Sequence, residues 1–217
     1  MAIITVSREF GSDGTLISQQ VAQSLNYLLV DKEVVEKVLR QYGMVHFSKL
    51  YDSEHSIWER YDLEKSELIL MLNDTIRAFA QIGNSVILGR GGFAVLSEYH
   101  NVLNVCIRAP LEQRVSSLMK CMPISDHRAA ENLVVKNDNI RKSFLQTFYN
   151  VRHDETSYYN LVIDSSQIPA ELATRWIVEA AEMIDQRELS LEQSTQGIDV
   201  DPVLARTVAD IIADMRE

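Results

Sequence analysis

The sequence predicts an α/β layer fold with a mainly parallel sheet. Short apolar runs rich in β-branched residues recur along the chain, and most precede a segment with the spacing of an amphipathic helix. Strands that alternate with helices favour parallel pairing, because each helix returns the chain across the sheet. The chain has 217 residues, of which 46% are hydrophobic, so it can bury a substantial core. We expect one domain with a small appendage.

The N-terminal third begins with a strand and ends with a long helix. Its expected elements are a strand at 2–7 (AIITVS), a helix at 14–25, the helix KEVVEKVLRQYG and a helix at about 64–82. Residues 27–31 (YLLVD) fit either a second short strand or a loop that enters the next helix. Residues 44–64 are irregular and rich in aromatic side chains.

The centre of the chain continues the alternation. Strands are expected at 85–89 (SVILG), 102–107 (VLNVCI) and 160–164 (NLVID). Helices are expected around 93–96, through LEQRVSSLM, at about 126–136, at about 138–150, and through PAELATRWIVEAAEMI. Pro110 suits the first turn of the second of these helices, and Pro169 lies near the start of the last.

The C-terminal part is polar before it becomes helical. Residues 186–200 indicate a linker. A final helix is expected within 201–217, from about Pro202 to Arg216, with Val208 and Ile211 on its apolar face. That face fits either docking on its own domain or a contact between subunits, so a homodimer is one expectation.

The composition argues against several classes of protein. A net charge of −10 and a pI near 5.0 weigh against a nucleic-acid-binding face, although a few arginines in one cleft suffice for a small anionic substrate. The sequence shows no apolar run of membrane-spanning length and no signal-peptide pattern at the N-terminus. Cys106 and Cys121 lack metal-ligand spacing and are expected to be reduced thiols. We therefore expect a cytoplasmic protein without membrane or nucleic-acid partners.

The stretch ITVSREFGSDGTLISQQVAQSL, residues 4–25, has the order of a phosphate-binding loop: strand, glycine turn and helix. N–H groups at a helix start, together with the helix dipole, form a site for an anion. Gly11 and Gly14 allow a close backbone turn, and Ser12 or Thr15 offers a hydroxyl to a phosphate or to its magnesium. In the simpler alternative, Asp13 is an ordinary N-cap and Gly14 a turn glycine. No lysine occurs in this stretch, and the Asp13 carboxylate repels an anion.

This stretch, continued by LLVDKEVV, resembles the cytidylate kinase-like family, relatives of the nucleoside monophosphate kinases. The matching residues are Ser7, Arg8, Glu9, Phe10, Gly11, Ser12, Gly14, Asp31, Lys32 and Glu33. IRAFAQIGNSVILGRGGFAVL (76–96), VCIRAPLEQRVSSLM and residues 137–166 resemble later parts of the family in the expected order. The likeness covers roughly residues 3–185. The chain departs from the family at Asp13, which replaces a glycine, and at Thr15, where a basic or small residue is common.

The resemblance implies a P-loop-kinase-like three-layer sandwich at 1–185, with a helical lid at about 122–156. It also implies ATP-dependent phosphoryl transfer with Mg²⁺. The donor phosphates are then held by the loop residues Gly11, Ser12, Asp13, Gly14 and Thr15, with Thr15 as a possible Mg²⁺ contact. Arg8, Arg90 and Arg141 are expected to supply the catalytic cations in place of a lysine, because guanidinium groups match phosphate oxygens.

The acceptor side rests on the same resemblance. Arg90 is expected to bind the acceptor, a small nucleotide or metabolite, because GRGG follows a predicted parallel strand. Asp31 either contacts the acceptor or orders a loop, and Asp138 either serves the lid or forms an ordinary i,i+3 surface pair with Arg141. A non-catalytic protein that retains the kinase fold is the alternative function.

Overall fold

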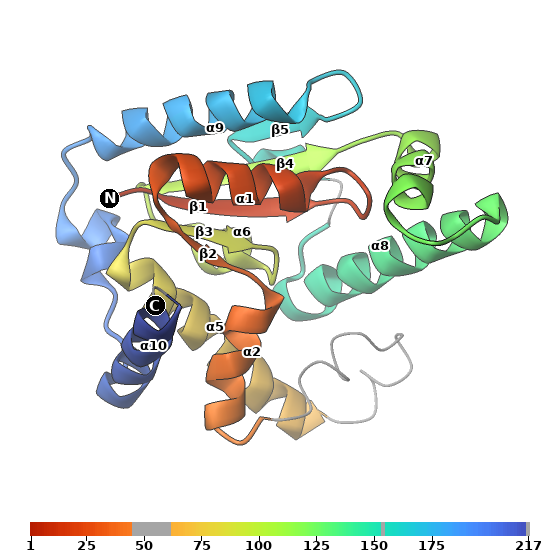
Figure 1. The fold of residues 1–217 in the computed structure, drawn as a ribbon. Coiled ribbons are helices and arrows are strands. Elements are labelled where there is room, and N and C mark those ends of the chain that lie inside the picture. The colour runs from red at the N-terminus through yellow and green to blue at the C-terminus, as the bar shows by residue number, and fades with distance from the viewer. Residues whose placement is uncertain (45–61, 153–154, 216–217) are drawn as a thin grey trace.

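Five parallel strands form the central sheet, in the order β2-β3-β1-β4-β5 (Figure 1). The computed structural model describes residues 1–44, 62–152 and 155–215, and of residues 62–66 only the backbone. The strands are β1 (Ile3–Arg8), β2 (Leu28–Val30), β3 (Ser85–Leu88), β4 (Val102–Arg108) and β5 (Leu161–Asp164). The predicted α/β fold with a mainly parallel sheet is confirmed.

Helices cover both faces of this sheet (Figure 1). Helices α1 and α9 lie on one face, whereas α2, α5 and α10 lie on the other. Helices α7 and α8 lie beyond the carboxyl ends of the strands. The helices are α1 (Gly14–Leu25), α2 (Lys32–Gln41), α5 (Asp62–Ile82), α6 (Gly92–Val95), α7 (Leu111–Cys121), α8 (His127–Tyr149), α9 (Ala170–Asp185) and α10 (Pro202–Asp214), with 3-10 turns η1 (Thr156–Tyr158), η2 (Leu191–Gln193) and η3 (Thr195–Gly197).

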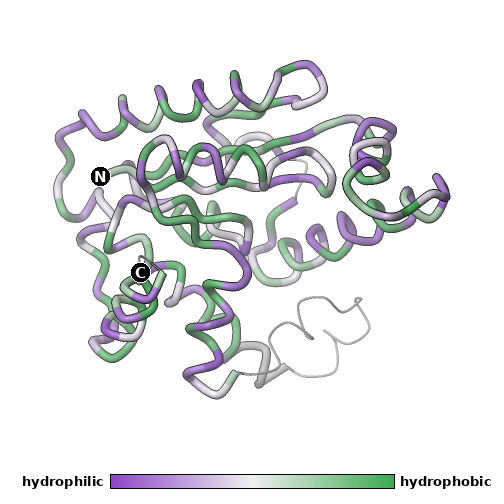
Figure 2. The backbone as a smooth tube through the Cα atoms, viewed as in Figure 1, coloured by the Kyte–Doolittle hydropathy of each residue, from purple (hydrophilic) through white to green (hydrophobic). Residues whose placement is uncertain are grey.

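The core has two parts, one on each face of the sheet. Because successive strand residues point to opposite faces, Ile3 belongs to the core under α5 and Ile4 to the core under α1 and α9. Both faces are covered, so the strands are apolar almost throughout, as Figure 2 shows by their green colour. The strand ends, by contrast, carry polar side chains such as Arg8, Arg108 and Asp164.

Helix boundaries follow from capping residues. The Asp126 carboxylate accepts the N–H of Ala129 at 3.1 Å and so begins α8, and Asn150 ends that helix in a left-handed conformation. Asp201 caps α10 in the same way, with Pro202 in its first turn.

Two local predictions needed correction or resolution. The two helices expected at 126–136 and 138–150 are wrong, because α8 is continuous and no glycine or proline interrupts it. Residues 27–31, left open between strand and loop, contain the short strand β2. Of the irregular segment 44–64, residues 45–61 lie outside the described residues.

The segment 186–200, predicted as a linker, is tied to the domain by hydrogen bonds. The Asn101 side chain donates to Thr195 Oγ1 at 2.9 Å and accepts the Thr195 N–H at 3.0 Å. The Gln81 amide donates to the Ile198 carbonyl at 2.7 Å. Helix α10 then packs its apolar face, which includes Val208 and Ile211, into the core beside α5 and α2. In this structure the final helix therefore docks on its own domain.

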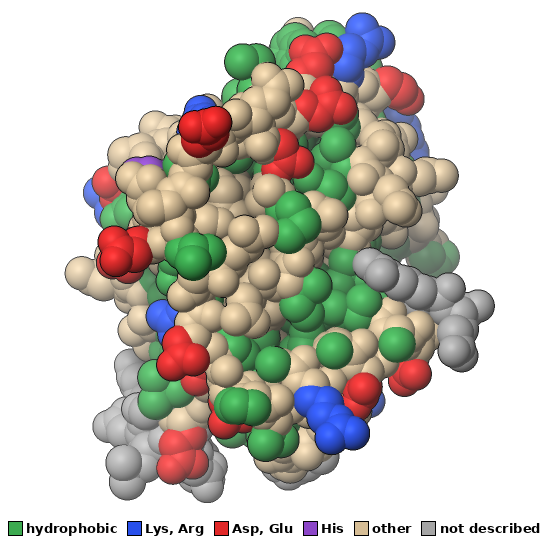
Figure 3. All heavy atoms as spheres, turned by 90° about the vertical axis from the view of Figure 1, so that its left-hand side faces the viewer, with side chains coloured by type: hydrophobic (Ala, Val, Ile, Leu, Met, Phe, Trp, Pro, Cys, Tyr) green, Lys and Arg blue, Asp and Glu red, His purple; other side chains and the backbone are tan. Residues whose placement is uncertain are grey.

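The face at the amino ends of the strands is shown in Figure 3, where hydrophobic side chains lie exposed between acidic ones. Exposed hydrophobic residues of the described part include Met183 in α9, Leu191 in η2 and Val203 in α10. The homodimer stays a prediction. None of the helices in the described part of the chain is long and apolar enough to cross a membrane.

Candidate functional site

The β1–α1 loop, residues 9–13, lies at the carboxyl edge of the sheet. Its backbone is left-handed at Gly11, with φ of 83°, and at Asp13, with φ of 58°. Within the described residues no hydrogen-bond acceptor is found for the N–H groups of Gly11, Asp13 and Gly14, nor for those of Thr15 and Leu16 in the first turn of α1. A loop and helix start with unsatisfied N–H groups fit an anion such as a phosphate.

The side chains of the loop divide between inside and outside. Ser12 is 1% exposed, and its hydroxyl lies 2.9 Å from the Glu9 carbonyl and 3.1 Å from the Ile107 carbonyl. The Ser12 hydroxyl is therefore used within the loop. Asp13 and Thr15 are exposed, and Asp13 occupies the N-cap position without a side-chain capping bond. Asp13 thus occupies the N-cap position that the simpler alternative predicted, but its carboxylate does not cap the helix.

The two loop glycines are required by contacts within the protein. A Cβ on Gly11 would lie 2.8 Å from the Arg114 carbonyl oxygen, and a Cβ on Gly14 would lie 2.5 Å from Cβ of Arg8. Both distances are too short for a real Cβ. The close backbone approach expected of these glycines is therefore an approach to α7 and to β1.

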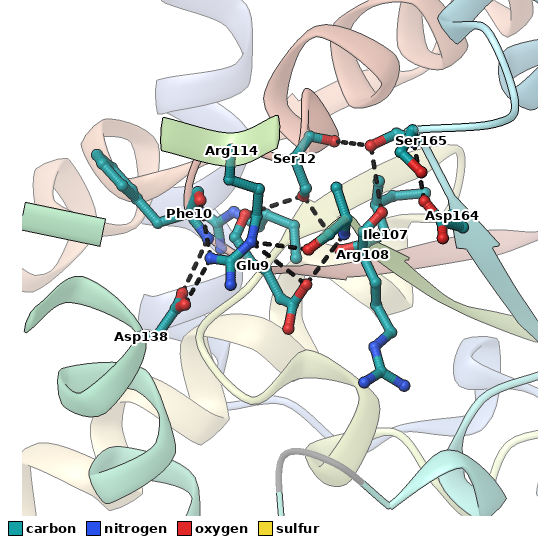
Figure 4. A network of polar contacts seen from close by, with 12 residues as sticks. Glu9, Phe10, Ser12, Ile107, Arg108, Arg114, Asp138, Asp164 and Ser165 are labelled. Atoms are coloured by element: carbon teal, nitrogen blue, oxygen red, sulfur yellow. Dashed lines mark hydrogen bonds and ion pairs between the residues drawn. The ribbon is translucent and has the colours of Figure 1, made fainter. Parts of the chain in front are cut away.

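Behind the loop, a buried arginine connects α7 and α8 to the β1–α1 loop (Figure 4). Arg114 donates from Nε to the Ala109 carbonyl at 2.9 Å and from Nη1 to the Phe10 carbonyl at 3.1 Å. Its Nη1 also pairs with Asp138 Oδ2 at 2.6 Å, and Asp138 Oδ1 accepts the Phe10 N–H at 3.0 Å. Glu9 adds a carboxylate 3.6 Å from Arg114 Nε. The cluster therefore restrains the start of the loop, at Glu9 and Phe10.

A pocket beside the loop brings together the three arginines predicted to be catalytic. We call it the arginine pocket; its lining residues are Ser7, Arg8, Gly89, Arg90, Gly91, Phe93, Arg141, Phe144 and Leu145. Arg141 reaches into it from α8, donates to the Arg8 carbonyl at 3.1 Å, and lies over the Phe10 ring at 5.4 Å. The pocket therefore combines cationic and aromatic walls.

Arg90 lies in an unusual backbone turn. It is 6% exposed, and its φ of 56° is left-handed, as are those of Gly89 (76°) and Gly91 (73°). A Cβ on Gly89 would overlap Arg8 Nη1, and one on Gly91 would overlap the Tyr149 ring. The Tyr149 hydroxyl lies 2.8 Å from Asn73 Oδ1 and 3.5 Å from the Arg90 carbonyl oxygen. Packing from α5 and α8 thus holds a strained conformation that turns Arg90 toward the pocket.

The two acidic residues predicted for the acceptor side, Asp31 and Asp138, lie outside the arginine pocket. Asp31 directly follows β2 and caps α2. Its carboxylate accepts the N–H groups of Glu33 at 2.9 Å and Val34 at 3.1 Å. This is the loop-ordering alternative; an acceptor contact of Asp31 stays a prediction. Asp138 is 7% exposed and bonded to Arg114, so it is not part of an exposed surface pair.

Sequence reasoning missed Arg114 and Arg108. Arg114 falls on the same helical face as Val115 and Leu118, and a charged residue in an apolar stripe is a signal that it has a buried partner. Arg108 ends β4, and Figure 4 shows its side chain extending away from the Glu9–Arg114 cluster. Within the described residues its guanidinium has no hydrogen bond or ion pair. Arg108 is thus a further cation at this edge of the sheet.

Burial changes the acid–base behaviour of two groups near the site. Burial raises the pKa of the Cys106 thiol, on β4, to about 12. The pKa of the Tyr159 hydroxyl is also raised, mainly by burial. Both groups therefore stay protonated at neutral pH. In the described residues no group of three or more His, Cys, Asp or Glu side chains is arranged to hold a metal ion.

Comparison with curated proteins finds two relatives that are named cytidylate kinase. The chain is 26% identical over 174 residues to a cytidylate kinase of Methanocaldococcus jannaschii, an alignment that covers 78% of this chain and 91% of the relative. It is also 26% identical over 168 residues to a cytidylate kinase of Methanosarcina barkeri, covering 76% and 87%.

Solved structures share the fold at lower identity. A protein from Eubacterium ventriosum superposes with a TM-score of 0.67 at 23% identity, covering 86% of this chain and all (100%) of the other. Shikimate kinase from Bacteroides thetaiotaomicron superposes with a TM-score of 0.51 at 11% identity, covering 83% and 98%. These likenesses show a P-loop-kinase-like fold. The model of the cytidylate kinase-like family matches residues 3–167, three quarters of the chain, and the protein therefore belongs to the cytidylate kinase-like family.

Proposed function

We propose that the protein is an ATP-dependent phosphotransferase that acts, with Mg²⁺, on a small acceptor of the nucleotide class. One observation carries the proposal: Arg8, Arg90 and Arg141 line one pocket beside a loop with unsatisfied N–H groups. Phosphoryl transfer requires mainly that donor and acceptor are aligned and that cations surround the transferred group. The similarity to proteins named cytidylate kinase supports a nucleotide acceptor.

On the donor side, the β1–α1 loop binds phosphate oxygens through the N–H groups of Gly11, Asp13 and Gly14. The helix dipole of α1 adds to this attraction, because its positive end faces the loop. Mg²⁺, when bound, neutralises phosphate charge and orients the oxygens. The exposed Thr15 hydroxyl, in the first turn of α1, is the candidate protein contact for that ion.

On the acceptor side, Arg90 binds the anionic group of the acceptor, and Arg8 and Arg141 stabilise the negative charge on the phosphoryl group in transfer. A guanidinium offers planar, paired donors, so arginines can replace the lysine that the loop lacks. Phe93 and Phe144 form apolar walls of the same pocket and keep water from the reacting groups. Asp31, at the carboxyl end of β2, is a further candidate contact for the acceptor.

The test is phosphate transfer from ATP–Mg²⁺ to a pool of nucleoside monophosphates, followed by chromatography. The wild type should form a new diphosphate, and Arg90→Ala should abolish it. Arginine and alanine pay a similar cost for the left-handed backbone at position 90. The variant therefore removes the guanidinium without adding backbone strain. Arg77→Ala is the matched control, because Arg77 is a partly exposed arginine on α5 that pairs with Asp74. Equal turnover by the Arg90 variant would remove Arg90 from the site.

A second candidate function is nucleotide binding, or protein interaction, without catalysis. Two observations favour it: the exposed Asp13 carboxylate in the loop, and the absence of lysine between residues 4 and 25. No consumption of ATP in the transfer assay would support this alternative over the kinase. Production of ADP without a new diphosphate would instead indicate hydrolysis, or an acceptor outside the pool.

A further inference from the structure

The peptide bond between Phe10 and Gly11 is held from one side only. In a trans peptide the C=O and the next N–H point in opposite directions. Arg114 Nη1 donates to the Phe10 carbonyl at 3.1 Å, so it holds this carbonyl on the side of α7. The Gly11 N–H, in the same peptide plane, must then point away from α7. It is one of the N–H groups that have no acceptor in the described residues.

Asp138 completes the restraint. Its Oδ1 accepts the N–H of Phe10 at 3.0 Å, and its Oδ2 lies 2.6 Å from Arg114 Nη1. Arg114 and Asp138 are both nine-tenths buried, so the pair competes little with water, and charge-assisted hydrogen bonds of this length are strong. A buried ion pair that bonds both the N–H and the C=O of one residue leaves that residue little freedom to rotate.

The pair also links the loop to α8. Asp138 and Arg141 lie three residues apart on that helix and face the same side. Asp138 bonds the Phe10 N–H, and Arg141 bonds the Arg8 carbonyl and lines the arginine pocket. One helix face therefore contacts both the donor loop and the pocket of the proposed acceptor.

We propose that Arg114 and Asp138 are positioning residues, which orient the Gly11 N–H toward the donor phosphates and make that orientation depend on the placement of α8. The proposal rests on the proposed function, since it assumes that the loop binds a nucleotide. It gives Asp138 a place behind the loop instead of a direct contact with substrate.

The test measures binding of ATP–Mg²⁺ by calorimetry to Arg114→Lys, Asp138→Asn and the double variant. Arg114 reaches Ala109 from Nε and both Phe10 and Asp138 from Nη1, whereas lysine has a single terminal nitrogen. Asparagine at position 138 keeps an acceptor for the Phe10 N–H but loses the charge. Each single variant should bind about tenfold more weakly or worse, the value of one hydrogen bond to a charged group. Because the two residues act as one unit, the double variant should lose no more affinity for ATP–Mg²⁺ than the single variant that binds it more weakly. Asp74→Asn, which breaks the exposed Arg77–Asp74 pair, should bind like the wild type.

The readouts separate positioning from stability. A merely structural role would lower the melting temperature and leave the Kd of the folded protein unchanged, and that result would overturn the inference while the proposed function stands. A wild type that binds no nucleotide would overturn both.

Hydrogen exchange of the wild type gives a measurement that needs no variant. Without nucleotide, the Phe10 amide should exchange slowly and the Gly11 amide fast, and ATP–Mg²⁺ should then protect Gly11. Fast exchange at Phe10, or no protection of Gly11 in a protein that binds ATP, would contradict the proposed restraint.

Discussion

Gly89 and Gly43 allow the role of the Arg8 guanidinium to be separated from backbone strain. Both glycines are left-handed, with φ of +76° at Gly89 and +78° at Gly43. A Cβ on Gly89 would overlap Arg8 Nη1, whereas no atom of the described residues lies within 4 Å of a Cβ on Gly43. Gly89→Ala therefore displaces Arg8, and Gly43→Ala changes only the backbone.

The two variants should be destabilised to a similar extent. A left-handed alanine costs roughly 1–2 kcal/mol, and the reduced freedom of the unfolded chain offsets part of this, so each should lose about 1 kcal/mol of unfolding free energy. For a chain of this size that lowers Tm by about 2–4 °C. The steric cost at Gly89 is small, because its neighbour is the end of a flexible arginine side chain that can rotate away.

The activities should differ sharply. Displacing the Arg8 guanidinium removes the charged hydrogen bond that we propose it makes to the transferred phosphoryl group. Such a hydrogen bond is worth roughly 1.5–3 kcal/mol. We therefore expect Gly89→Ala to lower kcat/KM by roughly ten- to a hundredfold, while Gly43→Ala stays near the wild type. Thermal unfolding and the nucleoside monophosphate transfer assay measure the two effects on the same preparations.

Two results would refute this reasoning. Equal kcat/KM in both alanine variants would show that the Arg8 guanidinium contributes nothing where it lies. A Gly89→Ala protein several kcal/mol less stable than Gly43→Ala would show that Arg8 cannot move aside, so that the loss of activity could not be assigned to Arg8 alone.

Three further predictions concern the thiols, the loop and the last helix. In native protein at pH 8.5 a thiol reagent should modify exposed Cys121 and spare buried Cys106. Burial raises the pKa of Cys106 from 9.0 to about 12, so its protonated thiol contributes unfolding free energy that is fully present below pH 9 and is lost between about pH 9 and 12. Two reactive thiols in folded protein would contradict this. Asp13→Gly should raise stability by up to about 1 kcal/mol and strengthen ATP binding, and an unchanged Kd would mean that the carboxylate lies away from phosphate. Ile211→Ala (4% exposed) should cost about 2–5 kcal/mol and Val203→Ala (65% exposed) less than about 0.5, so equal losses in thermal unfolding would exclude the described docking of α10.

The strands were predictable because their signal is local. Runs such as Ile3–Val6 and Val86–Leu88 are apolar and β-branched, and burial on both faces of a parallel sheet requires that pattern. Strand β2 stayed ambiguous because three residues are too short to show a period. Prolines marked the starts of helices such as α7 and α9 well, since Pro110 and Pro169 directly precede them.

The continuity of α8 was not predictable in the same way. The polar run Lys136–Asn139 interrupts the apolar pattern and indicates a break between two helices. In the structure Asp138 faces inward, because it is paired with Arg114, 24 residues earlier in the chain. A local pattern contains no information about such a partner. The Asp138–Arg114 pair therefore explains why neither the continuous helix nor the restraint of the β1–α1 loop was predicted.

Arg8 and Arg90 were predicted from their place beside glycine turns, and Arg141 was predicted from the resemblance of its helix to the family's lid. What the sequence does not contain is the geometry of the turn at Arg90, where the left-handed backbone depends on packing by Tyr149 from another helix. Arg108 lies in the family-like stretch VCIRAPLEQRVSSLM but stands beside no glycine turn, and its place beside the site follows from the register of β4 in the sheet.

The docking of α10 has a consequence for how the protein is made. Ile211 and Val208 fill the same core that α2 and α5 build from much earlier parts of the chain. Domains generally fold as units during synthesis, once the residues that complete their core are available. The side of α2 and α5 that α10 covers is therefore completed only after α10 has been synthesised, and until then the nascent chain leaves these apolar side chains uncovered.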